Sequence, residues 1–276
     1  GYHEEPYSDI SIDKVTLHTN YLDPNIPRNL WEHSLSVGSL IIADTNNDHG
    51  MAGTCPNCNL YFVSSYSGDN FSFTTKIEML DILIEEGVKV VNYSIGCDNC
   101  YSQIEQDAIN DAYEQGIVIV ASAGNEKHNT DTNPHYPACY DNVIGVAGSN
   151  YFSSNYGLQN INVSAPSDGV LTAFTSGTDI ENCYNEYGEW VIPDETNSSD
   201  ELEIIYCPFR VQSGTSFGTS FVTGLMGLLL SHNPDLTNQD LVDIVVSTTG
   251  EILNPWGAGS RPVSYTHLTL PTKRIV

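Results

Sequence analysis

Ile117–Asn125, with the sequence IVIVASAGN, is the stretch that decides the fold. It carries no charged side chain, and its first polar residue, Ser122, comes near its end. A strand without a polar face is buried on both sides, which is typical of a parallel sheet covered by helices. Asn125 follows directly, at the carboxyl end of the predicted strand, where open α/β sheets form their sites. An asparagine placed there can donate its side-chain N–H to a developing oxyanion.

Strands and helices alternate on both sides of this stretch. Glycines end two amphipathic segments, 74–87 and 102–116, which we predict to be helices. Apolar runs at 60–66, 88–96 and 142–148 predict further strands. This βαβ alternation predicts an α/β fold in three layers, with a mostly parallel sheet between helices on both faces.

The C-terminal part departs from this alternation. Residues 175–212 are acidic and rich in Asn and Tyr, without an apolar period, and predict a surface insertion. The helix that follows is apolar on nearly every side and should be buried, and Thr237 with Asp240 predicts a capping box for the next helix. Residues 263–276 resemble a translated sequencing adapter and are excluded from the fold. We therefore expect one domain over 1–262.

The composition excludes several classes of partner. Nine Lys and Arg stand against 35 Asp and Glu, giving a formal net charge of -26. Such a chain is repelled by nucleic acid and by anionic lipid, and no apolar run is long enough to span a membrane. The carboxylates could instead bind Ca²⁺.

Seven cysteines favour an exported protein. Two pairs have the CxxC spacing: Cys55 with Cys58, and Cys97 with Cys100. They could form one four-thiolate zinc site, but that requires two loops to meet, so two local disulfides are favoured. Cys183 and Cys207 flank the acidic insertion and are a plausible third pair, which leaves Cys139 unpaired.

Ser216 lies in the segment GTSFG, at the start of the predicted buried helix. The positive end of a helix stabilises an oxyanion, although a serine there can also be a simple N-cap. The segment matches the G-x-S-x-G elbow of α/β-hydrolases as well. That fold needs its histidine downstream, and only His232 follows before residue 263, so the elbow is not favoured.

Several motifs together resemble those of the subtilisin-like serine peptidases. GTSFGTSFVTG resembles GTSMAxPxVAG, ASAGN resembles AAAGN, and NYSIG resembles the substrate-binding N-x-S-x-G strand. YPACYDNVIGVAG and SSNYGLQNINVSAPSDGV resemble YPAxYxxVIxVGA and FSNYGxxVDVxAPG. Their order and spacing agree from about residue 30 to residue 259. The resemblance implies the subtilisin-like fold and an endopeptidase that hydrolyses polypeptides.

The resemblance also selects one histidine. The segment that begins at His33, HSLSVGSL, is similar to H-G-T-H-V-A-G-T, and the later GTCP is similar to G-V-A-P. His49 then lies in the loop between them, where Asn47 and Asp48 are candidate ligands of a structural Ca²⁺. Ser34 replaces a usual glycine and Ser220 a usual proline, but neither side chain performs the chemistry.

The implied roles follow residue by residue. His33 takes the proton of Ser216, and Asn125 with the Ser216 backbone N–H holds the oxyanion. Substrate contacts are expected from Ser94, Ile95, Gly96, Ala123, Gly124, His135 and Thr215. His135 is either a simple loop residue or the floor of a partly filled pocket that prefers small or polar side chains, and tolerates acidic ones when charged.

The acid of the triad is not found within the chain. The family carries it in D-x-G, a little over thirty residues before the histidine, whereas Asp9, Asp13 and Asp23 are too close to His33 and lack the glycine. Gly1 has the right distance to be that glycine, so we expect the acid, and the central first strand that carries it, upstream. The chain as printed should then be poorly soluble and inactive.

Three classes of function follow. The favoured one is a secreted or cell-surface, monomeric endopeptidase that needs no cofactor for its chemistry. A catalytically inactive relative that binds peptides would differ only in the acid. A zinc-stapled binding module would require metal on all four CxxC thiols.

Overall fold

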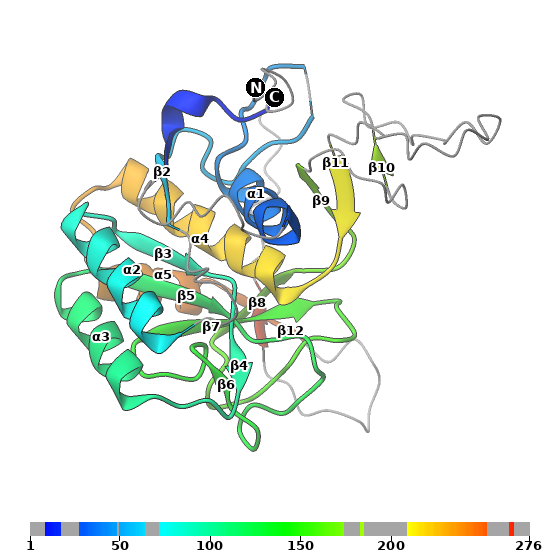
Figure 1. The fold of residues 1–276 in the computed structure, drawn as a ribbon. Coiled ribbons are helices and arrows are strands. Elements are labelled where there is room, and N and C mark those ends of the chain that lie inside the picture. Colours follow the sequence, from blue (N-terminus) through cyan, green and yellow to red (C-terminus); the bar gives the residue numbers. More distant parts are fainter. Residues whose placement is uncertain are drawn as a thin grey trace.

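The computed structural model describes residues 9–17, 28–48, 50–63, 72–173, 183–184, 209–252 and 265–267. Its largest sheet has the strand order β12-β13-β8-β7-β5-β3 (Figure 1). Four neighbouring strands run parallel: β3 (Val90–Tyr93), β5 (Val118–Ser122), β7 (Val143–Ser149) and β8 (Val163–Pro166). The predicted parallel sheet is therefore confirmed, with β3 shorter than the expected 88–96.

The far edge of this sheet holds two short strands. β12 (Gly250–Ile252) pairs antiparallel with β13 (Tyr265–His267). β13 joins β8 through a single residue pair, His267 with Ser164. β13 lies within the segment predicted to be an adapter remnant, and that prediction stays open.

β5 shows why the sheet has helices on both faces. All five of its residues are buried. Ile119 and Ala121 pack with residues of α2 (Phe73–Glu85) and α3 (Gln103–Glu114). Val118 and Val120 point the other way and pack with residues of α4 (Thr215–His232) and α5 (Asn238–Ser247). Burying each such side chain contributes about 1.5–3 kcal/mol, so the alternation fixes three layers (Figure 1).

The helix ends follow the expected local chemistry. Gly87 and Gly116 have φ values of 72° and 85°, and each lies just beyond the C-cap of its helix. At the start of α5, the Thr237 side chain accepts from Asp240 N, and the Asp240 side chain accepts from the Thr237 backbone, which confirms the capping box. α4 is buried along its first half, as predicted.

A second, smaller sheet stands apart from the large one. The 3-10 helix η1 (Ile12–Lys14) leads into β1 (Val15–Leu17), which pairs parallel with β2 (Leu60–Phe62) and with no strand of the large sheet. A cavity of about 550 Å³ lies between β2 and β3 and is lined by residues of both strands. α1 (Arg28–Ile42) packs on α4 and also lines this cavity.

The remaining described strands form two small sheets of their own. β9 (Val170–Ala173), β11 (Phe209–Gln212) and β10 (Cys183–Tyr184) form an antiparallel sheet. β10 and β11 fall inside the predicted insertion, residues 175–212. Residues 175–182 and 185–208 of that insertion lie outside the described part. Its last four residues are thus a strand rather than aperiodic loop. β4 (Cys97–Asp98) pairs with β6 (His135–Tyr136).

The cysteine predictions can be compared with the structure directly. Disulfides join Cys55 to Cys58 and Cys97 to Cys100. This excludes the four-thiolate zinc site, because all four sulfurs are consumed. Cys139 is free, as expected, whereas Cys207 lies outside the described residues.

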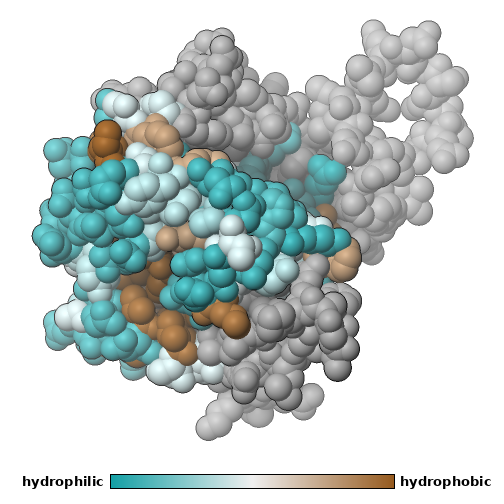
Figure 2. Space-filling view, turned by 90° about the horizontal axis from the view of Figure 1, so that it is seen from below, coloured by the Kyte–Doolittle hydropathy of each residue, from teal (hydrophilic) through white to brown (hydrophobic). Residues whose placement is uncertain are grey.

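The surface agrees with the composition. The face viewed in Figure 2 is mainly hydrophilic, with smaller hydrophobic areas, as expected for a net charge of -26. Within the described ranges, no helix has the length and apolar character needed to cross a bilayer.

Candidate active site

Ser216 lies in the first turn of α4, at the edge where the parallel strands end. Its side chain is nearly buried, with 9% of its surface exposed. Its Oγ donates to the backbone oxygen of Ser94 at 3.4 Å, and Ser94 Oγ donates back to the Ser216 carbonyl at 3.2 Å. These two bonds hold the segment after β3 against the N-terminus of α4, where backbone N–H groups lack helical partners.

Asn125 is oriented by the residue before Ser216. Its Oδ1 accepts from the backbone N of Thr215 at 2.9 Å and from Thr215 Oγ1 at 3.1 Å. Thr215 Oγ1 in turn accepts from Gly124 N at 3.2 Å. Because the amide oxygen is held in this way, the amide nitrogen of Asn125 is left to donate on the other side. The structure therefore brings together the predicted nucleophile and the predicted oxyanion donor, from segments ninety residues apart.

His33 lies on α1 and packs beside the helix that carries Ser216. Its ring centroid is 6.3 Å from that of Phe217, the residue after the serine. Burial lowers its pKa from 6.5, because desolvation disfavours the charged ring. Within the described ranges, His33 forms no hydrogen bond with Ser216 and no ion pair with a carboxylate. The ring therefore lies beside Phe217, the chain neighbour of Ser216, and no carboxylate among the described residues fixes its orientation.

The cavity beside His33 separates the edges of two parallel strand pairs. One wall is β2 and the residue after it, and the opposite wall is β3 with Ser94 and Ile95. β2 has its one described partner in β1, and β3 has its one described partner in β5, so the two facing edges are unpaired within the described residues. Both pairings are parallel. A strand between them would satisfy backbone groups that otherwise cost free energy.

The predicted substrate residues form two neighbouring walls with His135 between them. A Cβ atom on Gly96 would collide with His135 Nε2, and one on Gly124 would lie 2.8 Å from His135 Cε1. The ring is buried, with 5% of its surface exposed, and its Nδ1 bonds to Asp98 Oδ1 at 2.7 Å. The ring therefore fills the space between Gly96 and Gly124.

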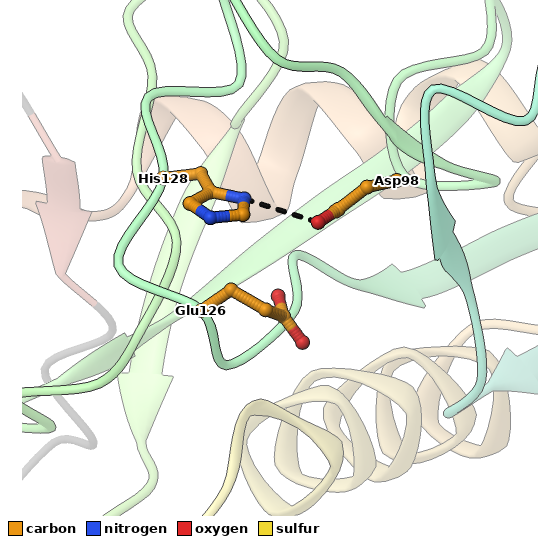
Figure 3. Close-up of side chains that lie close together, drawn as sticks. All are labelled: Asp98, Glu126 and His128. Atoms are coloured by element: carbon orange, nitrogen blue, oxygen red, sulfur yellow. Dashed lines mark ion pairs between the residues drawn. The ribbon is translucent and has the colours of Figure 1, made fainter.

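Three residues near this pocket were not anticipated from the sequence. Asp98, Glu126 and His128 each offer a ligand atom, and these atoms lie within 4.8 Å of one another (Figure 3). Asp98 lies on β4, whereas the other two lie on the loop after β5. The one sequence signal was the position of Glu126 and His128 directly after Asn125; nothing in the sequence pointed from them to Asp98.

The predicted calcium ligands lie in an exposed loop between α1 and β2. Asn47 donates its amide N–H to Asp9 Oδ1 at 3.0 Å, and Met51 N donates to Asp9 Oδ2 at 2.7 Å. Asp9 is buried, and these two bonds to its carboxylate organise the loop. Asp48 is exposed, His49 lies outside the described residues, and the calcium site stays a prediction.

The chain is similar in sequence to known proteins. A model described as "Subtilase family" matches residues 7–266. The thermophilic serine proteinase of Bacillus sp. (strain AK1) is 30% identical over 214 residues, which cover 75% of this chain and 44% of that protein. Thermitase of Thermoactinomyces vulgaris is 30% identical over 216 residues, which cover 77% of this chain and 66% of that protein. The chain thus spans only part of the length of these relatives.

Solved structures of proteases also match the fold of this chain. A protease from Pseudoalteromonas arctica matches with a TM-score of 0.63 at 26% identity, over 79% of this chain and 64% of that chain. A cold-adapted subtilisin-like serine proteinase matches with a TM-score of 0.63 over 86% of this chain and 73% of that chain, and at 20% identity it supports the fold alone.

Proposed function

Because the chain belongs to the subtilase family, we propose that the protein is a serine endopeptidase that cleaves polypeptides through an acyl-enzyme on Ser216. The observation that carries this proposal is the junction of Asn125, Thr215 and Ser216. It places an oriented amide donor beside a nearly buried serine at a helix N-terminus. This combination suits a tetrahedral oxyanion.

The proposed mechanism moves protons through His33 in both the acylation step and the deacylation step. His33 accepts the Ser216 proton as Oγ attacks the peptide carbonyl, and the resulting oxyanion is held by Asn125 Nδ2 and the Ser216 backbone N–H. The imidazolium then gives its proton to the leaving amine, which breaks the C–N bond and leaves the acyl-enzyme. Water then attacks the ester with His33 as base, and His33 returns the proton to Ser216 Oγ as the acid product leaves. Burial keeps His33 neutral at lower pH than usual, which is the form that a base requires.

We place the acid of the triad on a strand that fills the cavity between β2 and β3. Both unpaired edges belong to parallel pairs, and His33 lines the same cavity. An Asp two positions before Gly1 would supply the carboxylate. The chain as printed should then be poorly soluble and lack peptidase activity, since apolar walls and unpaired edges stay open. Soluble and active material of this length would contradict that placement.

The substrate is proposed to pair with Ser94, Ile95 and Gly96 as an added strand, so that its backbone is read more than its side chains. His135 fills the pocket between Gly96 and Gly124, which favours a small side chain on the N-terminal side of the cleaved bond. That acidic side chains are tolerated when His135 is charged stays a prediction. Asp98 bonds to His135 Nδ1 at 2.7 Å, so its carboxylate would share that charge with an acidic substrate group.

Other observations support a proposal for the location of the enzyme, its oligomeric state and its bound ions. Two disulfides favour a secreted or cell-surface location, and the minor extracellular protease Epr of Bacillus subtilis is 29% identical over 86% of this chain. The chemistry needs no cofactor. We propose a monomer with a structural Ca²⁺ near Asn47 and Asp48.

The test is peptide hydrolysis by the full-length gene product. Ser216→Ala and His33→Gln should each lower the turnover rate to the residual level, because the two groups act as a unit. Ser231→Ala and His232→Gln are matched controls at the far end of α4, and both should keep full activity. Unchanged activity in Ser216→Ala would refute the proposal.

A second candidate is a catalytically inactive subtilase relative that binds peptides. The native sequence upstream of Gly1 separates the two candidates. Asp-x before Gly1 at the end of an apolar strand supports the peptidase, and another residue at that position supports peptide binding without cleavage.

A further inference from the structure

Asp98, Glu126 and His128 form a polar cluster that takes no part in the proposed chemistry. Their ligand atoms lie within 4.8 Å of one another (Figure 3). The exposed fractions of the side chains are 27% for Asp98, 43% for Glu126 and 38% for His128. The cluster is therefore compact, and a small ion can reach it from solution.

His128 Nδ1 has two contacts that a single ring nitrogen cannot satisfy together. It lies 3.0 Å from Asp98 Oδ2 and 2.6 Å from the amide nitrogen of Asn133. A protonated Nδ1 suits the carboxylate but opposes the amide N–H, and an unprotonated Nδ1 does the reverse. The amide oxygen of Asn133 accepts from Asn99, which favours this orientation of the amide. A cation on Asp98 Oδ2 would relieve the repulsion between that oxygen and an unprotonated Nδ1 that accepts from Asn133.

The charge balance of the cluster also favours a cation. Within the described ranges, the ion-pair partners of Asp98 and Glu126 are histidines alone. Lys127, the neighbouring basic residue, places its Nζ 3.0 Å from the ring centroid of Phe152 instead. With neutral histidines, two carboxylates face one another without a full counter-charge, which a divalent ion would supply.

The groups around the cluster hold its members in place. Asn155 is fully buried, and its Oδ1 accepts from the backbone N of Glu126 at 3.0 Å and of His128 at 2.8 Å. Its Nδ2 donates to Glu126 Oε2 at 2.7 Å. His135 Nδ1 bonds to Asp98 Oδ1 at 2.7 Å and leaves Oδ2 on the side of His128. Carboxylates that bind metal ions are typically held in place by hydrogen bonds of this kind.

From this geometry we infer that Asp98, Glu126 and His128 bind one divalent transition-metal ion. Imidazole nitrogen with carboxylate oxygens suits Zn²⁺ and similar ions, with water completing the coordination. The ion joins β4 to the loop after β5, which are extensions of the two walls around His135. This role in the substrate pocket rests on the proposed function. The site is separate from the calcium site proposed near Asn47.

The test is Zn²⁺ binding to the full-length gene product carrying Ser216→Ala, which cannot digest itself. Calorimetry should show a site that Asp98→Asn and His128→Gln each weaken at least about tenfold. Co²⁺ in place of Zn²⁺ should give visible absorption bands that both variants lose. Asp243→Asn and His232→Gln, on exposed parts of α5 and α4, are matched controls and should bind as the parent does.

Two outcomes would overturn the inference: no Zn²⁺ binding by the parent, or equal binding by parent, Asp98→Asn and His128→Gln. Because binding is measured without turnover, the result is independent of the peptidase assay. Zn²⁺ binding by a protein that never cleaves peptides supports the site and rejects the proposed function. Active peptidase without Zn²⁺ binding rejects the site alone.

Discussion

Replacing Asn125 by leucine should slow the chemical step while leaving substrate binding nearly unchanged. The side chain ends β5 with its Oδ1 held by Thr215 N at 2.9 Å and Thr215 Oγ1 at 3.1 Å. Leucine has a similar size but offers no N–H to the oxyanion. Loss of one such donor costs about 2.7–4 kcal/mol in the transition state, which is about 10²–10³ in kcat. KM should stay within about threefold, because the donor acts mainly on the transition state.

Thr215→Val tests how much the hydroxyl of Thr215 contributes to the orientation of the Asn125 amide. It removes the Oγ1 bonds to Asn125 and to Gly124 N but keeps the backbone bond to Asn125. The part of this loss that acts on the orientation of Asn125 is one hydrogen bond, about 0.5–1.5 kcal/mol. We therefore expect kcat to fall about two- to twelvefold. Initial rates on a peptide substrate with the full-length product measure both variants, and thermal unfolding confirms that each is folded. A kcat for Asn125→Leu within about threefold of the parent would refute the oxyanion role.

Three further predictions concern stability and titration, all measured in the Ser216→Ala background. Glu105→Gln leaves buried Lys76 without its partner at 3.3 Å, and urea unfolding should show a loss of about 3–5 kcal/mol; a loss below about 1 kcal/mol would contradict this. Thr237→Ala removes the cap of α5 and should lower the free energy of unfolding by about 1 kcal/mol, whereas an unchanged value would show that the capping box is dispensable. Replacing the proposed upstream carboxylate by its amide should lower the pKa of His33, since burial then acts on the ring without a compensating charge; an unchanged pKa in histidine NMR titrations would place the acid elsewhere.

The sequence was sufficient for the elements whose signals are local. The apolar run of β5 predicted a strand buried on both faces, and the structure buries all five residues. Gly87 and Gly116 marked helix ends, and the spacing of Thr237 and Asp240 identified a capping box. The closeness of Asn125 and Ser216 followed from strand order together with motif resemblance, and Thr215 supplies the bonds that hold it.

Features that depend on contacts between distant segments were not predictable in the same way. Asp98 meets His135 because β4 pairs with β6, and neither two-residue strand has a periodic pattern. Glu126 and His128 are held by Asn155, a buried side chain whose role follows only from the fold. The cavity between β2 and β3 is likewise a property of packing.

Covalent labelling of the full-length gene product with a fluorophosphonate tests most directly whether Ser216 is an activated nucleophile. The reagent reacts with a serine that has a base and an oxyanion site, and mass spectrometry locates the modified residue. We predict one label on Ser216, slowed by His33→Gln and unaffected by His232→Gln. A folded protein that stays unlabelled, or carries the label on another serine, would contradict the proposed peptidase.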